Sequence, residues 1–510
     1  MSGPSRKPDL DQAEVEHARG GLATATSSVW LLTAWGVAAL ASVVINLVAR
    51  RVLTEEGGYG NFALVLATVV WVEYVVVATF PISYQKLASE SVDNLPRILK
   101  SVVHLYLPVC LVLWVVYSLA APLISRALRD PGLTPFFLSA GLDIPLVGLY
   151  AVAVGVLNGT GRTGQMGLAS AGYQCGRMVF ITGTMVVLWA VGFGPDLAIC
   201  GGLLGKALAS VLGLTIALRF LRPIFRRQAA GAQGLLADHV LRYGVPLGVT
   251  TVAVHLLINV DHWFVKALLG PPRIDYYMAA RAVAFPLVFV GLAMRSAVFP
   301  TMAINLHRGN RREALISLRT ALRVVLLVGG LFCALLPPTA RELMSWLFWY
   351  PEAGLAMVLL VLSMVPFAAF MVYVSAFAAA DRPLEPLPIL LGLVPLAVVG
   401  HATVIPRLGI GGASTVTLSV LVLGVAVSAL WLWRRLGARP PVMNLIRIGV
   451  TAAFVAVVSR RVPAEGVWLL PKYAAMGLIY AALLLAVREV RLSEVVQLLR
   501  AVRGKLVRSR

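Results

Sequence analysis

Apolar runs of about twenty residues recur along the whole chain and leave little choice of fold. Each run is close to the ~20 residues with which an α-helix crosses a bilayer. The runs lie at 22–49, 61–85, 101–123, 135–158, 166–192, 197–218, 243–265, 276–303, 315–338, 353–379, 387–405, 410–433, 445–460 and 466–487. Because backbone groups in lipid must be hydrogen-bonded within the protein, runs of this length are expected to be helical. We predict an all-α polytopic membrane protein with about 14 transmembrane helices.

The composition supports this fold and argues against a soluble protein. Of the 510 residues, 59% are hydrophobic and only 13% are charged, whereas soluble domains carry roughly 45–50% and about 25%. The net charge of +21 would suggest nucleic-acid binding in a soluble chain. Here the basic residues fall between apolar runs, where they meet anionic lipid headgroups. We therefore expect membrane lipids, and no nucleic acid, as partners.

The distribution of Lys and Arg predicts the topology. Basic residues concentrate in the segments that an N-terminus in the cytoplasm would place inside, which favours an even number of spans with both termini cytoplasmic. The first run is too long for a signal-peptide core, so we read it as a span of the plasma (inner) membrane. The predicted inside segments include a tail at 1–21, a basic linker at 219–242 and a basic tail at 488–510, with Leu492, Val495, Leu499 and Val502 spaced as on an amphipathic helix.

The cysteines predict neither metal binding nor disulfides. All four lie in apolar stretches without the spacing of a metal site, namely Cys110, Cys175, Cys200 and Cys333. We interpret them as small buried apolar residues. No metal and no cofactor is predicted.

The chain repeats itself with a period near 220 residues. Tyr59 has a counterpart in Tyr277 at 218 positions, and Phe80-Pro81 has one in Phe299-Pro300 at 219. Further matches follow in the same order. Two parallel six-helix units, a lobe at 22–218 and a lobe at 243–433, would account for them, with two extra helices at 445–487. Because six is even, both lobes enter the membrane in the same orientation, which places a substrate site between them near the midplane.

Two segments resemble those of a transporter family. Arg51-Val52-Leu53 through Gly58-Tyr59-Gly60 is similar to the segment that follows the first helix of polysaccharide flippases, and Asp275-Tyr276-Tyr277 with Phe299-Pro300 resembles their eighth helix. Together with two six-helix halves and two further helices, these segments resemble the oligosaccharide-flippase branch of the multidrug/oligosaccharidyl-lipid/polysaccharide exporter superfamily. The resemblance implies export of an oligosaccharide linked to undecaprenyl pyrophosphate, for cell-surface polysaccharides such as lipopolysaccharide. It also implies a basic cavity lined by spans one, two, seven and eight.

Two arginines of span eight are the leading candidates for substrate binding. An ionisable side chain in a span costs ~2.5 kcal/mol or more at the bilayer centre, so each one needs a partner, a wet cavity or a function. Arg281 and Arg295 are 14 residues apart, which on one helix is about 21 Å of rise and about 40° of rotation. Guanidinium groups bind phosphate oxygens in pairs and suit a diphosphate headgroup. The alternatives are that Arg281 reaches the outer interface and that Arg295 pairs with Asp261 or a helix end.

Other polar residues in the spans are secondary candidates. Asp261 and His262, placed near the outer end of span seven, together with His255, are candidates for ion coupling or for neutralising an arginine. Asn46 and Asn259 occupy comparable places in spans one and seven, where their amides could bind sugar hydroxyls or neighbouring helices. Glu73 is a candidate acid of the cavity. For Asp143, Arg177 and Lys206 of spans four to six, an internal charge pair is the simpler interpretation.

Two other classes of function compete with a flippase. A multidrug/cation antiporter shares the architecture, but it usually has twelve spans and needs acids to hold cations. A membrane glycosyltransferase or polymerase needs a sizeable outer catalytic domain, whereas the predicted outer segments have only about ten to twenty residues. We therefore predict a transporter and not an enzyme. Polymerase or glycosyltransferase partners would make and use its lipid-linked glycan.

Overall fold

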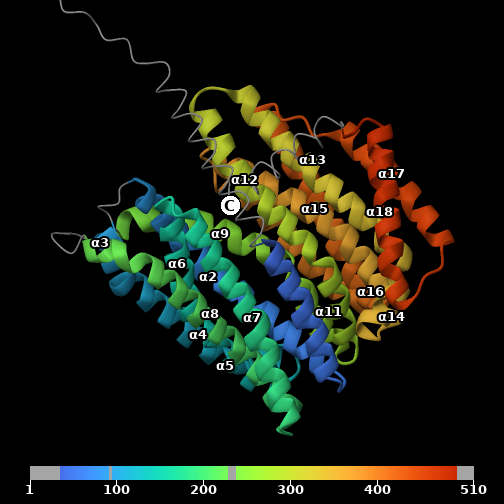
Figure 1. Cartoon of the computed structure of the whole chain (residues 1–510), viewed down its shortest axis with the longest axis horizontal. Helices are drawn as coiled ribbons and strands as arrows, with labels where there is room; N and C mark the ends of the chain where they lie inside the picture. The colour runs from blue at the N-terminus through green and yellow to red at the C-terminus, as the bar shows by residue number, and fades with distance from the viewer. Residues whose placement is uncertain (1–34, 91–94, 228–236, 491–510) are drawn as a thin grey trace, which may run out of the picture.

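The computed structural model describes residues 35–90, 95–227 and 237–490, and these residues form helices joined by short turns (Figure 1). The N-terminal half begins with the helix Trp35–Val52. It continues with α2 (Gly58–Glu90), α3 (Leu95–Ser101), α4 (Leu107–Ala127), α5 (Thr134–Gly141), α6 (Asp143–Gly159), α7 (Thr163–Ala190) and α8 (Gly194–Arg227). The π-helical turn Val102–Tyr106 joins α3 to α4, so that these two helices run on as one rod.

The C-terminal half is also built from long helices, and two of its spans are each broken into two helices. It comprises α9 (Ala237–Leu257), α10 (Val260–Leu269), α11 (Arg273–Ala284), α12 (Pro286–His307), α13 (Arg311–Leu335), α14 (Ala340–Phe348), α15 (Gly354–Ala379) and α16 (Leu387–Leu436). The chain ends in α17 (Val442–Arg461) and α18 (Leu469–Ala486). In α16 the backbone departs from helical geometry at Gly409, whose φ of 59° suits a residue without a Cβ.

The structure agrees with 14 spans. Twelve helical stretches of the described residues are long and apolar enough to cross a membrane. One of them, Leu387–Leu436, holds two spans that meet at Gly409. A further span, α7, falls short in hydropathy because it carries Gln174 and Arg177 among its apolar residues. The first predicted span begins in residues outside the described part. The predicted tail at 1–21, residues 228–236 of the basic linker and residues 491–510 of the C-terminal tail also lie outside it.

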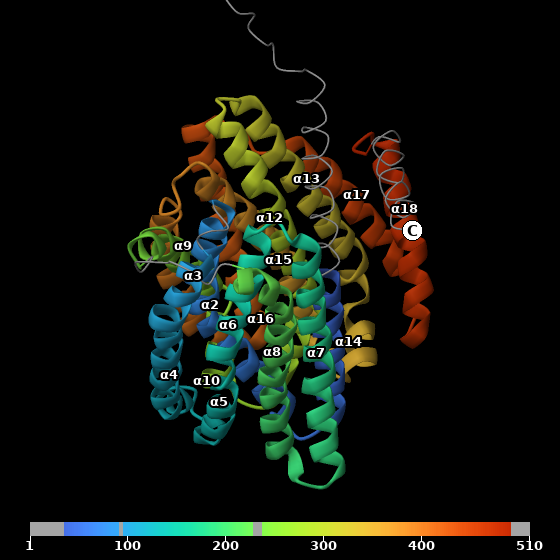
Figure 2. The ribbon, with the colours of Figure 1, turned by 60° about the vertical axis from the view of Figure 1, so that its left-hand side comes forward.

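The two halves lie side by side as bundles of steeply inclined helices (Figures 1 and 2). Helix α2 packs against α6 within its own half and against α9 and α11 of the other, so it forms much of the boundary between the halves. Large apolar side chains cover the outside of the bundles: Leu119 on α4 is 71% exposed and Val450 on α17 is 65% exposed. An apolar exterior of this kind is stable in lipid and not in water.

Spans seven and eight are each interrupted near their middle. Span seven breaks at Asn259, between α9 and α10, and span eight breaks at Phe285, between α11 and α12. Pro286 explains the second break because proline cannot donate the hydrogen bond that would continue the helix. The prediction that Arg281 and Arg295 share one face of a single straight helix is therefore wrong: they belong to α11 and α12.

The last two helices dock against the C-terminal half. The hydroxyl of Tyr480 on α18 donates to the carbonyl of Leu327 on α13 at 3.0 Å. The buried carboxylate of Glu489 accepts from Arg323 on α13 at 3.1 Å and from Asn444 on α17 at 2.5 Å. A single buried acid thus ties α17 and the end of α18 to α13.

Candidate functional site

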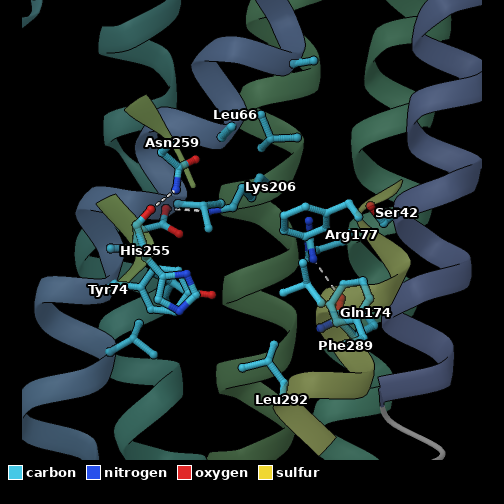
Figure 3. Close-up of a pocket in the computed structure, with 18 of the residues that line it drawn as sticks. Ser42, Leu66, Tyr74, Gln174, Arg177, Lys206, His255, Asn259, Phe289 and Leu292 are labelled. Atoms are coloured by element: carbon cyan, nitrogen blue, oxygen red, sulfur yellow. Dashed lines mark hydrogen bonds and ion pairs between the residues drawn. The ribbon is translucent and has the colours of Figure 1, made fainter. Parts of the chain in front are cut away.

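A cavity of about 350 Å³ lies between the two halves, with its wall built from both (Figure 3). The helix Trp35–Val52, α2, α11 and α12 contribute, as do His255 and Asn259 of span seven. These are the spans one, two, seven and eight that the family resemblance implied. Helices α6, α7 and α8 contribute as well, which the resemblance did not suggest. The cavity is flanked by apolar rings such as Phe289 and Phe285 and by a smaller number of charged groups.

Arg281 lies in the cavity wall and is held by the broken turn of span seven. Its Nη1 donates to the carbonyl of Ile258 at 2.6 Å and to Asp261 Oδ1 at 3.0 Å, and its Nη2 donates to Asn259 Oδ1 at 3.1 Å. The break at Asn259 is what frees the Ile258 carbonyl for this bond. Asp261 therefore neutralises Arg281, whereas the sequence offered Asp261 as a partner of Arg295.

Asp261 is deeper in span seven than the sequence suggested. Eight residues of α10 follow it, up to Leu269, so the span extends about 12 Å beyond it. Its carboxylate is fully buried and accepts from Tyr277 at 2.6 Å as well as from Arg281. The placement of Asp261 and His262 at the outer end of the span is therefore wrong. The sequence missed that α10 continues the span after the break.

The two asparagines occupy equivalent positions in the two halves. Asn46 Nδ2 donates to the carbonyl of Ser42, and Asn259 Nδ2 donates to the carbonyl of His255, each four residues earlier. The side-chain oxygens accept from another helix: Asn46 Oδ1 from Tyr59 at 2.9 Å, and Asn259 Oδ1 from Arg281. Both amides line the cavity, and their hydrogen bonds are of the kind that joins helices within a membrane.

Three charged side chains of the N-terminal half meet in one buried cluster. Lys206 on α8 donates to Glu73 Oε1 on α2 at 2.5 Å and to Asp143 Oδ2 on α6. All three residues are at most 4% exposed. Glu73 and Lys206 line the cavity, whereas Asp143 lies behind them and its Oδ1 has no partner among the described residues. The internal charge pair predicted among Asp143, Arg177 and Lys206 is formed by Asp143 and Lys206, and Glu73 joins it.

Arg177 on α7 lies outside this cluster. Its Nη1 donates to Gln174 at 3.0 Å, both side chains line the cavity, and Figure 3 shows them together on one wall. The guanidinium carbon lies 5.9 Å from the ring centre of Tyr173. In the described part of the chain Arg177 has no carboxylate partner, and its Nε has no partner at all. Arg177 is thus the cation of the wall with the most unused donor capacity.

Arg295 does not belong to the cavity wall among the described residues. It lies on α12, where its backbone carbonyl accepts from Ser375 on α15 at 3.2 Å. His255, by contrast, lines the cavity and stacks on Tyr74 with ring centres 3.6 Å apart (Figure 3). Of the two predicted arginines only Arg281 lines the wall, while Arg295 lies close enough to act electrostatically on Tyr74 and His255 of the wall.

Polar contacts join the two halves beyond one end of the cavity. The carboxylate of Asp275 on α11 accepts from the backbone N–H of Gly57 at 2.7 Å and from that of Gly60 at 2.5 Å. These donors belong to the buried start of α2, where backbone N–H groups have no partner within the helix and a negative charge is favourable. Lys266 on α10 donates to Asn61 and to Asp130 at 2.7 Å each. We call Asp275, Lys266 and these four partners the latch.

A buried arginine adds a further contact at the same end. Arg50 donates from Nε to the carbonyl of Phe348 at 3.1 Å, and its guanidinium lies 4.4 Å from the ring centre of Tyr350. Arg50 is buried and belongs to the N-terminal half, whereas Phe348 and Tyr350 belong to the C-terminal half, so it serves as a contact between the halves.

Comparison with known proteins identifies the family. Residues 25–306, more than half of the chain, match the family model described as polysaccharide biosynthesis protein. The chain belongs to this family. No curated protein matches it.

Solved structures show that this polysaccharide biosynthesis protein has the fold of the multidrug/oligosaccharidyl-lipid/polysaccharide exporter superfamily. A structure described as lipid II flippase MurJ in an inward closed conformation is 13% identical, with a TM-score of 0.69 over 90% of this chain and 99% of that one. An outward-facing multidrug resistance transporter is 14% identical, with a TM-score of 0.61 over 81% and 96%. The protein is therefore a multi-pass membrane protein with the fold that these transporters share.

Sequence reasoning missed several residues of this protein. Lys266 and Asp275 were not selected, although Asp275 belongs to the segment that carries the family resemblance. Their partners are more than 130 positions away in the chain, so no local spacing reveals them. No group of three His, Cys, Asp or Glu that could hold a metal occurs in the described residues.

Proposed function

We propose that this protein is a flippase that moves an oligosaccharide linked to a lipid pyrophosphate, of the undecaprenyl type, from the inner to the outer leaflet. The observation that carries the proposal is the charge of the cavity wall. In the described part of the chain, Arg177, Lys206 and Arg281 line it together with a single carboxylate, Glu73. Basic side chains in a confined apolar site favour a phosphate headgroup, and guanidinium groups can bind it in pairs.

The family and the fold support this proposal. The family model is that of polysaccharide biosynthesis, and one similar structure is described as a lipid II flippase. Asn46 and Asn259 at the wall would meet the first sugars, and Arg281 would hold the headgroup opposite Arg177. Arg295, His255 and His262 remain secondary candidates for headgroup or ion contacts. Among the described residues, the wall of the cavity has no carboxylate free of a cationic partner, which argues against the alternative of a multidrug/cation antiporter.

Alternating access of two lobes, 22–218 and 243–433, is the proposed mechanism. The latch would close the outer end of the cavity, and its separation would open it. Both termini would be cytoplasmic, in the inner membrane. Polymerases or glycosyltransferases would supply and consume the lipid-linked glycan.

The test is a set of Arg281 variants expressed in the native host. Arg281→Gln would be combined with Asp261→Asn, so that no unpaired carboxylate is left buried. We expect at least a tenfold loss of lipid-linked glycan in the outer leaflet at normal membrane levels, since a charged hydrogen bond is worth about 1.5–3 kcal/mol. Arg281→Lys would retain the charge but lose the paired geometry, with an intermediate effect. Arg308→Gln, at an exposed turn, is the control.

Unchanged export in the double variant would contradict the proposal. A loss of export that accompanies loss of protein from the membrane would be traced to folding, which the thermal stability of the purified variants measures directly.

A further inference from the structure

The Glu73–Asp143–Lys206 cluster has one carboxylate more than its cation can balance. With all three groups ionised, the cluster carries one negative charge inside the protein. Burying an uncompensated charge is costly, and one acceptor, Asp143 Oδ1, has no donor among the described residues. One of the two carboxylates would therefore have to bind a proton for the cluster to be neutral.

The position of each group shows where that proton can enter. Glu73 lines the cavity, and its side chain is 6% exposed. Asp143 is fully buried behind Lys206 and does not line the cavity. A proton from the cavity can thus reach Glu73 directly, while Asp143 remains the permanent counter-ion of Lys206.

The charges around the whole cavity explain why binding of an anionic headgroup would favour uptake of a proton. Three cations, Arg177, Lys206 and Arg281, stand against three acids, Glu73, Asp143 and Asp261, and Arg295 adds a fourth cation close enough to act on Tyr74 and His255 of the wall. The cavity and its supporting groups thus carry one net positive charge, which is less than a pyrophosphate headgroup with two ionised phosphates needs for compensation. Protonation of Glu73 adds a second positive charge and releases one donor of Lys206 toward the cavity.

We propose that Glu73 takes up a proton when the anionic headgroup binds, and that this unmasks Lys206 as a phosphate ligand in the wall of the N-terminal half. The inference rests on the proposed flippase function and extends it to proton linkage. Lys206 then donates to Asp143 and to a phosphate oxygen in place of Glu73. When the headgroup leaves, Glu73 returns its proton to the cavity and accepts from Lys206 again.

The other groups facing the cluster do not provide this proton. Its titratable and charged neighbours are Tyr74 on α2, Tyr117 on α4, Tyr173 and Arg177 on α7, and across the cavity His255 on α9, Arg281 on α11 and Arg295 on α12. Tyrosine and arginine titrate far above neutral pH. His255 stacks on Tyr74 and belongs to the other half, so a variant at Glu73 separates its titration from that of the cluster.

The experiment is calorimetric titration of the purified full-length protein with farnesyl pyrophosphate, in buffers of different ionisation enthalpy. The number of protons taken up per ligand would be compared between the wild type and Glu73→Gln, which cancels the ligand's own titration. We expect the wild type to take up about one proton more per bound ligand than Glu73→Gln. As the pH rises, the affinity of the wild type should fall by up to tenfold per pH unit relative to that of Glu73→Gln. Glu55→Gln is the control, because Glu55 is an acid in the exposed segment 54–56.

The possible results separate this inference from the proposed function. Equal proton uptake in the wild type and Glu73→Gln, with binding that still depends on Arg281, would overturn the inference and leave the flippase proposal intact. Affinity that rises with sodium at constant pH, without proton uptake, would also overturn it. Absence of any pyrophosphate binding by the wild type would overturn both.

Discussion

Charged residues inside this protein are arranged so that each cation of the cavity wall except Arg177 faces an acid on another helix. Lys206 on α8 contacts acids on α2 and α6, and Arg281 on α11 contacts Asp261 on α10. Such pairs are individually weak contributors to stability, because desolvation offsets their attraction. They are nevertheless costly to break, since the remaining partner stays buried without compensation.

Lys206→Met is therefore expected to be strongly destabilising. It leaves Glu73 and Asp143 buried without a cation, at a cost of about 3–5 kcal/mol. The triple variant Glu73→Gln, Asp143→Asn, Lys206→Met removes all three charges together and should recover most of that loss. Thermal unfolding of the purified proteins measures the difference. If Lys206→Met unfolds at the wild-type temperature, the three groups do not form the buried cluster described above.

At the scale of elements, α2 is the helix whose two ends touch the other half in different ways. Near its start, a Cβ on Gly60 would lie 2.7 Å from Asp275 Oδ1 and 2.8 Å from the Asp275 nitrogen. Nineteen residues further along, about 28 Å of helix, Thr79 packs against Gly244 and Gly248 on α9 so closely that neither glycine has room for a Cβ. Small residues allow this close approach of helices in membranes.

Two alanine substitutions should consequently shift the protein in opposite directions. Gly60→Ala disturbs the latch, and Gly244→Ala separates α2 from α9 at the other end. Overpacking costs about 1–3 kcal/mol, which shifts a two-state population by roughly fivefold or more. The readout is labelling of a cysteine at Ala67 in the cavity wall, in a background without native cysteines, by an impermeant thiol reagent. We expect faster labelling from outside intact cells for Gly60→Ala and slower labelling for Gly244→Ala.

The control is Gly183→Ala on α7, where an added Cβ has nothing within 4 Å. If both variants are labelled faster, or both more slowly, the prediction is contradicted. The two contacts would then not control opposite openings of the cavity.

The elements were largely predictable from sequence, and the pairing of the site residues was not. Long apolar runs mark spans because only helices satisfy the backbone in lipid, and Pro286 signals the break in span eight. Asn259 gives no comparable signal, so the break that positions Arg281 was missed. The approach of Glu73, Asp143 and Lys206 depends on how three spans pack, and residues separated by 133 positions carry no spacing that reveals it.

On the scale of the whole molecule, the two halves meet along α2, α9 and α11, with a charged cavity between them and the latch at one end. A protein built in this way has a natural two-state motion, because the latch can separate while each half keeps its own packing. The cavity is smaller than an oligosaccharide, so the glycan would pass only as the halves move apart.

The most direct measurement is translocation by purified protein in liposomes. A lipid-linked oligosaccharide from the host, carrying a fluorophore on its glycan, would be quenched from outside by dithionite, which does not cross the membrane. Asn61→Cys with Lys266→Cys, in a cysteine-free background, would allow a short reversible crosslink across the latch, with Asn61→Cys alone as the control.

We predict that protein-containing liposomes expose the inner-leaflet pool to quenching, that the crosslink stops this exposure, and that reduction restores it. Liposomes in which only the original outer-leaflet pool is quenched, with or without the protein, would contradict the proposed flippase function. Continued exposure of the inner pool in the crosslinked protein would contradict the alternating motion of the two halves.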